Sequence, residues 1–255
     1  MYDKNAPIGV FDSGVGGISV LRHLVREMPE ERFLYFGDSA NAPYGTRPTE
    51  EIKELTFRAA QHLMDQGCKA LVLACNTATS VAAKDLRMAL PNTVIIGIEP
   101  AVKPAALRFP GGTVGVIATP ATLRDGSKFT RLVEKYEQDC TVIRIPAPGL
   151  VELVEQGKAD SPEIEALLQP LLEPWRGKLD GLVLGCTHYP FAAPAIQRLL
   201  PGTVLFDGGA GTARHTRRRL AEEGLLGDHG VGEVIFENSS GSREILALCQ
   251  QLLED

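Results

Sequence analysis

Short apolar runs alternate with amphipathic stretches along almost the whole chain. The runs are rich in Val, Leu, Ile and Gly, which is typical of parallel strands that are buried on both faces. The stretches between them carry apolar residues at spacings of three and four, which predicts helices with one buried face. This alternation predicts an α/β fold in which parallel sheets are flanked by helices.

The elements follow from the boundaries of these stretches. The predicted strands are 7–11, 32–36, 69–74, 93–98, 113–118, 141–145, 179–184, 203–206 and 233–236. The predicted helices are 17–28, 49–66, one ending near 90, one ending near 136, 149–157, 162–176, one ending at 200, 210–223 and 242–254.

Two places are expected to carry the chain from one domain to another. The stretch 99–112 is rich in proline and glycine, and a return is expected near 206–211. We therefore expect an N-terminal α/β domain made of 1–98 plus 208–255, and a second α/β domain made of 99–207.

The sequence contains an internal repeat. Residues 70–79 read ALVLACNTAT and residues 181–190 read GLVLGCTHYP, and IGVFDS at 8–13 is similar to VGVIAT at 114–119. Strands of parallel sheets resemble one another, but a shared cysteine followed at once by small polar residues does not follow from packing alone. The repeat predicts two pseudo-symmetric copies of one α/β unit.

Polar residues stand where several predicted strands end. In open α/β sheets, ligands bind beyond the carboxyl ends of the strands. Any one of these residues could instead cap a helix, which is the main alternative for Ser39 or Thr119 taken alone. The residues at these exits are Asp12, Ser13, Asp38, Ser39, Cys75, Asn76, Thr77, Thr119, Cys186, Thr187 and His188.

Two of the five cysteines stand apart. Free cysteines are usually buried and inert, and this interpretation suits Cys68, Cys140 and Cys249. Cys75 and Cys186 are each expected to open a helix, where the helix N-terminus favours a thiolate. Two thiols on opposite sides of one carbon can remove a proton from one face and return one to the other. The pair therefore predicts a racemase that needs no cofactor.

Each of these thiols has a candidate acid–base partner. His188 lies two residues after Cys186, and this spacing along an extended exit places both side chains on one side. His188 is therefore expected to tune or relay the thiol proton, although a histidine that caps a helix is the alternative. Asp12 is expected to play the matching part near Cys75.

Composition and motifs exclude several classes of function. The chain has 255 residues and a formal net charge of −6, and no basic stretch is long enough to predict nucleic-acid binding. The Arg214–Arg219 cluster is interpreted as a solvated helix face. No apolar run approaches the roughly 20 residues of a membrane span, and the first residues lack the pattern of a secretory signal. An odd number of cysteines argues against a disulfide framework, so we expect a reduced, cytoplasmic protein.

Cofactor motifs are also absent from the sequence. There is no Cys-x-x-Cys pair and no His-Glu-x-x-His, so a metal site is not favoured. The glycines of Gly14–Gly17 fit neither of the two nucleotide-binding loop patterns. No lysine stands at a strand exit, which argues against a pyridoxal Schiff base. We therefore expect no cofactor.

Taken together, the motifs resemble the glutamate racemases of the cofactor-independent aspartate/glutamate racemase superfamily. The resemblance spans 8 to about 212, and the form Cys-Thr-His-Tyr-Pro is more similar to glutamate than to aspartate racemases. The motifs that carry it are FDSGVGG at 11–17, PYG at 43–45, ACNTA at 74–78, Ala118-Thr119 with Thr122, and GCTHYP at 185–190.

The resemblance implies two α/β domains with the active site in the cleft between them, and neither metal nor pyridoxal phosphate. It implies that Cys75 deprotonates D-glutamate and Cys186 deprotonates L-glutamate, with Asp12 and His188 assisting. Glu155 aligns with a further family glutamate, and nearby Glu152 leaves that assignment open. The positions that match the family's substrate-binding residues are Asp12, Ser13, Pro43, Tyr44, Gly45, Asn76, Thr77, Thr119, Thr122, Thr187 and His188.

The resemblance also implies a biological setting. The family supplies D-glutamate for peptidoglycan in bacteria, and racemases of this kind are often homodimers. The sequence departs from the family at 207–209 and matches it only loosely at 236–241. Two alternatives stay open: a related racemase that acts on aspartate or another amino acid, and a two-lobed binding protein with inert cysteines.

Overall fold

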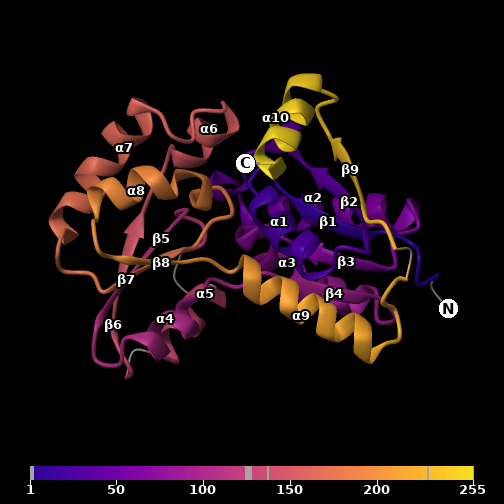
Figure 1. Cartoon of the computed structure of the whole chain (residues 1–255), viewed down its shortest axis with the longest axis horizontal. Coiled ribbons are helices and arrows are strands. Elements are labelled where there is room, and N and C mark those ends of the chain that lie inside the picture. Colours follow the sequence, from indigo (N-terminus) through magenta and orange to yellow (C-terminus); the bar gives the residue numbers. More distant parts are fainter. Residues whose placement is uncertain (1–2, 124–127, 137, 229, 255) are drawn as a thin grey trace. The chain divides into compact units, whose positions relative to one another are not determined.

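The computed structural model describes residues 3–123, 128–136, 138–228 and 230–254. The chain forms two compact units, one made of Met1–Ile98 with Gly209–Asp255 and the other of Glu99–Gly208. Each unit contains one parallel sheet with helices packed on it (Figure 1). This confirms the expected class of two parallel-sheet α/β domains.

The first unit contains a five-stranded parallel sheet in the order β4-β3-β1-β2-β9. Its strands are β1 (Ile8–Asp12), β2 (Arg32–Gly37), β3 (Ala70–Leu73), β4 (Val94–Gly97) and β9 (Glu233–Asn238). Its helices are α1 (Ile18–Glu27), α2 (Thr49–Asp65), α3 (Asn76–Ala89), α9 (Gly209–Glu222) and α10 (Arg243–Glu254), with short 3₁₀ turns η1 (Ser39–Asn41) and η2 (Tyr44–Thr46).

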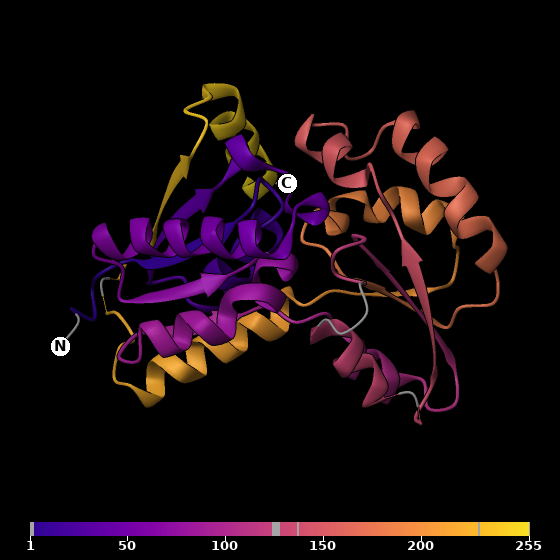
Figure 2. The ribbon, with the colours of Figure 1, turned by 180° about the vertical axis from the view of Figure 1, so that it is seen from behind.

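The core of the first unit explains why this sheet is stable. One sheet face packs against α2 and α3, which lie side by side in the reverse view of Figure 2. Helix α2 buries Ile52, Leu55, Ala59 and Leu63, at the spacing of three and four that places residues on one helix face. Because successive strand residues point to opposite faces, every second residue of β1 points to the sheet face away from α2 and α3. Strand β1 is buried along its whole length, as a strand covered on both faces should be.

The second unit contains a four-stranded parallel sheet in the order β6-β5-β7-β8. Its strands are β5 (Thr113–Ala118), β6 (Thr141–Pro146), β7 (Gly181–Leu184) and β8 (Val204–Phe206). Its helices are α4 (Val102–Arg108), α5 (Lys128–Glu134), α6 (Leu150–Glu155), α7 (Pro162–Leu172) and α8 (Ala193–Leu199), with 3₁₀ turns η3 (Glu173–Trp175) and η4 (Tyr189–Ala192).

The two sheets have the same connectivity. The order β4-β3-β1-β2 in the first unit corresponds to β8-β7-β5-β6 in the second, and the first unit adds β9 at its edge. In both units the central strand (β1 or β5) pairs with the strand that carries a cysteine just beyond its end (β3 or β7). The internal repeat in the sequence therefore corresponds to a structural repeat.

Three corrections apply to the predicted elements. The stretch 99–112, expected to carry the chain between the domains, also contains a helix that the pattern does not predict, α4, whose Pro104 lies in the first turn, where its missing N–H costs no hydrogen bond. The helix predicted over 162–176 ends at Leu172, and η3 follows with Pro174.

The third correction concerns Cys186, which does not open an α-helix: η4 begins only at Tyr189 and α8 at Ala193. Residues 124–127 of the helix expected to end near 136 lie outside the described residues, as do the first two residues of the chain. Within the part of the chain that the structure describes, no helix is both long and apolar enough to cross a membrane.

Candidate active site

Cys75 lies between the end of β3 and the start of α3. It is the N-cap residue of α3, and its Sγ accepts a hydrogen bond from the backbone N–H of Ala78 at 3.5 Å. The first turn of a helix leaves N–H groups without intrahelical partners and forms the positive end of the helix dipole. Helix α3 therefore stabilises negative charge on the Cys75 sulfur.

The end of β1 brings a second polar group to the same sulfur. Ser13 Oγ lies 3.5 Å from Cys75 Sγ in a buried contact. The neighbouring Asp12 is fully buried, and its carboxylate accepts a hydrogen bond from the backbone N–H of Gly14 at 3.1 Å. A methyl group at Gly17 would lie 2.6 Å from Asp12 Cβ, so the chain needs glycine there for Asp12 to keep its place.

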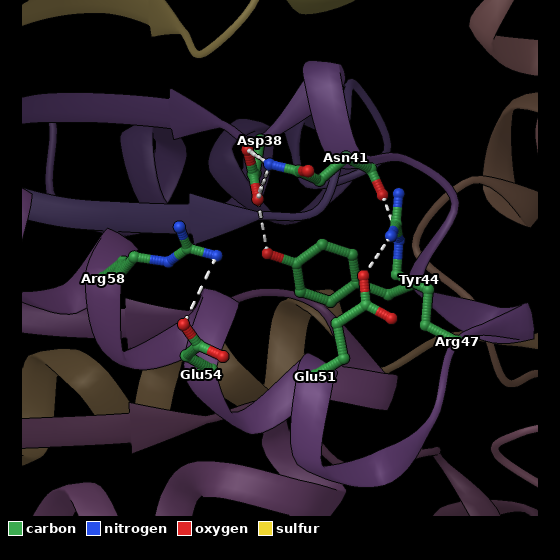
Figure 3. Close-up of polar contacts among 7 residues, drawn as sticks. All are labelled: Asp38, Asn41, Tyr44, Arg47, Glu51, Glu54 and Arg58. Carbon is green, nitrogen blue, oxygen red and sulfur yellow. Dashed lines mark hydrogen bonds and ion pairs between the residues drawn. The ribbon is translucent and has the colours of Figure 1, made fainter.

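Tyr44 adds a buried hydroxyl to this end of the first sheet. It follows Pro43, whose peptide bond with Ala42 is cis, and Gly45 after it is also buried. Its hydroxyl donates to Asp38 Oδ2 at 2.6 Å (Figure 3). Burial raises the pKa of Tyr44, and the hydrogen bond to Asp38 and the negative charges of Asp38, Cys75 and Asp12 raise this pKa further. Tyr44 thus stays a neutral donor.

Asp38 is the residue that sequence reasoning left out of the site. The sequence shows Asp38 as a carboxylate at a strand exit, but nothing in the sequence connects it to Tyr44. Its two oxygens also accept hydrogen bonds from Asn41 Nδ2 at 2.9 and 3.2 Å, which fixes the carboxylate beside the tyrosine hydroxyl.

Asn76 carries an unsatisfied polar atom. Its Oδ1 is buried and has no hydrogen-bond partner among the described residues, and the next residue, Thr77, is buried as well. A buried acceptor without a partner costs free energy, so such atoms in folded proteins call for an explanation. A ligand that donates a hydrogen bond to Asn76 would supply one.

Cys186 has the same place in the second sheet but different surroundings. It lies two residues beyond the end of β7, and its Sγ is 3.7 Å from Nδ1 of His188. Its neighbour Gly185 passes close to β5, since a methyl group there would lie 2.8 Å from Ala118 Cβ. The thiol is therefore supported by an imidazole and not by an α-helix N-terminus.

His188 connects this thiol to a carboxylate. Its Nε2 lies 2.5 Å from Oε1 of Glu155, which is on α6, and the His188 side chain is only 2% exposed. Burial by itself lowers the pKa of His188, but the hydrogen bonds and charges of Cys186 and Glu155 outweigh it, so the pKa lies well above its ordinary value. The surroundings of His188 thus favour the protonated imidazole beside the thiol. Of the two glutamates that the sequence left open, Glu155 makes this contact.

The other predicted residues of the second unit follow the ends of β5 and β7. Thr119 Oγ1 lies 3.1 Å from Thr122 Oγ1 and accepts from the backbone N–H of Thr122 at 3.3 Å. Thr187, between the cysteine and the histidine, is buried. Tyr189 donates its hydroxyl to the carbonyl of Ala147 at 3.0 Å, which anchors the loop that follows Cys186.

The predicted residues thus gather in two clusters, one in each unit. The first cluster contains Asp12, Ser13, Pro43, Tyr44, Gly45, Cys75, Asn76 and Thr77, and the second contains Thr119, Thr122, Glu155, Cys186, Thr187 and His188. Each cluster contains one thiol at the carboxyl end of an equivalent strand, together with groups that stabilise its charge. Such a pair of acid–base centres is suited to moving protons.

Comparison with known proteins defines the class. Residues 8–216 match the Asp/Glu/Hydantoin racemase family, so the chain belongs to that family. Within it, the chain is 45% identical over 254 residues to a glutamate racemase of Clostridium perfringens, covering 98% of this chain and 97% of the relative. The resemblance to glutamate racemases that the motifs predicted is therefore confirmed.

Solved structures agree with this assignment. The crystal structure of glutamate racemase from Thermus thermophilus in complex with beta-chloro-D-alanine has a TM-score of 0.82 and 41% identity, covering 98% of this chain and 94% of that one. A glutamate racemase from Francisella tularensis in complex with D-glutamate has a TM-score of 0.85 and 29% identity, covering 99% and 95%.

Proposed function

We propose that this protein interconverts L-glutamate and D-glutamate with two thiols and no cofactor. The observation that carries the proposal is the pair of cysteines at equivalent strand ends, each with its own charged or polar support. The likeness to glutamate racemases, one of them solved with D-glutamate, supports glutamate as the substrate.

The reaction is a transfer of two protons at one carbon. The thiolate on one face of the α-carbon takes the α-proton and becomes a thiol, while the thiol on the other face donates its proton and becomes a thiolate. The product is the other enantiomer, and one further proton exchange resets the enzyme. We assign proton removal from D-glutamate to Cys75 and from L-glutamate to Cys186.

The difficulty of the step is the weak acidity of the α-proton, which is far less acidic than a thiol. Without a cofactor to accept the electrons, the protein has to stabilise a carbanion-like transition state. Fixed hydrogen-bond donors at the substrate carboxylate are the means available. We propose that Ser13, the Pro43–Gly45 segment, Asn76, Thr77, Thr119, Thr122 and Thr187 hold the substrate.

The assisting groups have different roles. We propose that Asp12 assists Cys75. We propose that His188, which contacts both Cys186 and Glu155, assists Cys186. Asn76 Oδ1, which is buried and has no hydrogen-bond partner within the described part of the chain, is suited to accept a hydrogen bond from the substrate ammonium group. Glu155 is a positioning residue that acts through His188 and holds it protonated.

Circular dichroism of the free amino acid tests the proposal. Purified, reduced protein is incubated with pure D-glutamate, and separately with pure L-glutamate, without any added cofactor. Decay of both signals to zero is the expected result. No decay with folded protein would contradict the proposal.

The same assay separates the alternatives. Decay with D-aspartate but not with D-glutamate would favour a racemase of a different substrate. If Cys75→Ser and Cys186→Ser bind glutamate but the wild-type protein never racemises it, a binding protein is favoured.

We further propose that the enzyme works in the cytoplasm of a bacterium and supplies D-glutamate for peptidoglycan. The five free cysteines support a reducing compartment. Depletion of the protein should create a growth requirement for D-glutamate, and growth without it would contradict this role.

We also propose a homodimer, and light scattering should give twice the 27.5 kDa of one chain.

A further inference from the structure

A cavity lies in the first unit beside the Asp38–Tyr44 pair. It has a volume of about 230 Å³ and is lined by Phe36, Asp38, Asn41, Leu55, Arg58, Ala59, His62 and Ser239. These residues come from the end of β2, the turn η1, one face of α2 and the residue after β9. Neither thiol nor its assisting groups line it, and Asp38 connects the cavity to Tyr44 of the site described above.

The walls of the cavity combine an apolar floor with two opposite charges. Phe36, Leu55 and Ala59 supply apolar surface, and the Phe36 ring packs against His62 with centroids 4.7 Å apart and the ring planes tilted by 44°. Asp38 lines one side. Arg58 lines another and extends from α2 toward the side where Asp38 and the Tyr44 hydroxyl lie (Figure 3).

Each charge keeps capacity for a ligand. In the Asp38 carboxylate, Oδ2 accepts from Tyr44 and Asn41, while Oδ1 accepts from Asn41 alone among the described residues. An oxygen of a carboxylate can accept two hydrogen bonds, so Oδ1 has room for another donor. Arg58 pairs only loosely with Glu54, at 3.9 Å and in an exposed position, so its planar guanidinium can bind a carboxylate.

Other ligand classes fit these walls poorly. Sites for drug-sized molecules measure roughly 300–1,000 Å³, so the cavity is small for a nucleotide. A phosphate dianion would lie near the buried carboxylate of Asp38, which repels it. Among the described residues there is no group of three metal-ligating side chains. A purely apolar ligand would cover part of Asp38 and Arg58 without offering either charge a hydrogen bond.

We propose that this cavity binds an α-amino acid with an apolar side chain. The ammonium group binds Asp38 Oδ1, the carboxylate binds Arg58, and the side chain lies on Phe36 and Leu55. Glutamate itself is disfavoured, because its second carboxylate would lie on the apolar floor.

The cavity is positioned to influence the thiol chemistry. Asp38 lines the cavity, and its carboxylate also accepts a hydrogen bond from the Tyr44 hydroxyl at 2.6 Å. A bound ammonium group would compete with the Tyr44 hydroxyl for the negative charge of the Asp38 carboxylate. Tyr44 belongs to the segment that we assign to substrate binding, so this regulatory part of the inference rests on the proposed function. Binding itself does not.

Calorimetry with phenylalanine and its two truncated analogues tests the binding. L-Phenylalanine and L-leucine should bind, whereas 3-phenylpropanoate, which lacks the ammonium group, and phenethylamine, which lacks the carboxylate, should bind at least about ten-fold more weakly, as expected for the loss of one charged hydrogen bond. Equal binding of all three aromatic probes would overturn the recognition of a zwitterion. Absence of heat with both amino acids would overturn the site.

Two variants and one control locate the site. Arg58→Gln changes an exposed side chain and should weaken phenylalanine binding at least about ten-fold. Ala59→Leu should abolish binding by filling the cavity. Glu54→Gln, which removes the loose partner of Arg58 but lies outside the cavity, should keep the affinity. Unchanged binding in Arg58→Gln would contradict the assignment even if Ala59→Leu fails to fold.

Racemisation of glutamate at saturating phenylalanine tests the regulation. The wild-type turnover should change, and the turnover of Arg58→Gln should not respond. Binding without any racemase activity would refute the proposed function and leave the site standing. Full racemase activity without binding would refute the site alone.

Discussion

The two cysteine clusters share one place in the fold but differ in how they hold charge. Cys75 caps α3 and contacts Ser13, so its support is a helix N-terminus and a hydroxyl. Cys186 precedes a 3₁₀ turn and contacts His188, which in turn contacts the Glu155 carboxylate. The repeated strand order fixes where each thiol lies, and the residues after each strand fix its chemistry.

This difference has a use in a two-base reaction. When one thiol removes a proton, the other must already carry one, so the two sites cannot titrate alike. Support from fixed backbone dipoles does not change with pH, whereas support from an imidazole requires that the imidazole is protonated. The comparison therefore predicts that variants of the two clusters differ in their effects on the racemisation reaction and on its pH dependence.

The largest effect is expected from the thiols themselves. Cys75→Ser and Cys186→Ser should each lower the rate of racemisation by roughly 10²–10⁴-fold, because a serine hydroxyl is a far poorer base than a thiolate. Circular dichroism with both enantiomers measures the rate. Cys140→Ser, a buried cysteine outside both clusters, should keep near wild-type activity. Full activity in either of the first two variants would end the two-thiol account.

The assisting groups should give mirror-image isotope effects. His188→Asn should slow racemisation by roughly 10²-fold, since it removes the acid–base partner of Cys186. Because the equilibrium constant of a racemisation is one, kcat/KM falls equally in both directions and does not separate the two sites.

The α-deuterium isotope effect separates the sites. In His188→Asn it should rise for L-glutamate and fall for D-glutamate, and Asp12→Asn should show the reverse. An identical response to both enantiomers in both variants would mean that these residues do not serve separate thiols.

Glu155→Gln should have a smaller effect with a clear pH signature. It removes the carboxylate that raises the pKa of His188, so this pKa should fall in the variant. The turnover should drop by roughly ten-fold, the equivalent of one charged hydrogen bond. Histidine side-chain NMR across a pH series measures the pKa directly, and Glu152→Gln is the matched control. An unchanged His188 pKa would show that Glu155 does not hold the imidazole protonated.

The same pair links stability to pH. A pKa that is raised on folding adds stability that is complete below the ordinary histidine pKa of about 6.5 and is lost as pH rises through the raised value. The difference in unfolding free energy between wild type and Glu155→Gln should therefore shrink as pH rises. Denaturant unfolding at several pH values measures it, and a difference that grows with pH would contradict the assignment.

The smallest expected effects concern glycines beside the two clusters. Gly185→Ala and Gly17→Ala should each cost about 1–3 kcal/mol of unfolding free energy, because the new methyl group would overlap Ala118 or Asp12. Gly211→Ala, in α9 with open space around it, should gain about 0.4–1 kcal/mol. Thermal unfolding compares the three, and a neutral Gly185→Ala would show that the Cys186 loop can shift.

Local pattern was enough to predict much of this architecture. The apolar runs located the strands, and the repeated cysteine exits identified the two clusters, because the carboxyl ends of parallel strands are where α/β proteins bind ligands. His188 was placed beside Cys186 from spacing alone. These inferences needed only residues that are close together in the sequence.

Contacts that depend on an irregular turn or on how a helix packs were beyond such reasoning. The hydrogen bond from Tyr44 to Asp38 depends on the path of an irregular turn. The choice between Glu152 and Glu155 depends on how α6 packs, since both lie on one short helix. The helix expected after Cys186 was wrong because the chain first forms η4, which carries Pro190 in its first turn.

The most direct test of the two-thiol account is exchange of the α-hydrogen in ²H₂O, followed by NMR. Cys186→Ser should exchange deuterium into D-glutamate but not into L-glutamate, and Cys75→Ser should do the reverse. In both cases the remaining thiol works on its own face without inversion. If either variant exchanges both enantiomers equally, a single base serves both faces and the account of two separate thiols is contradicted.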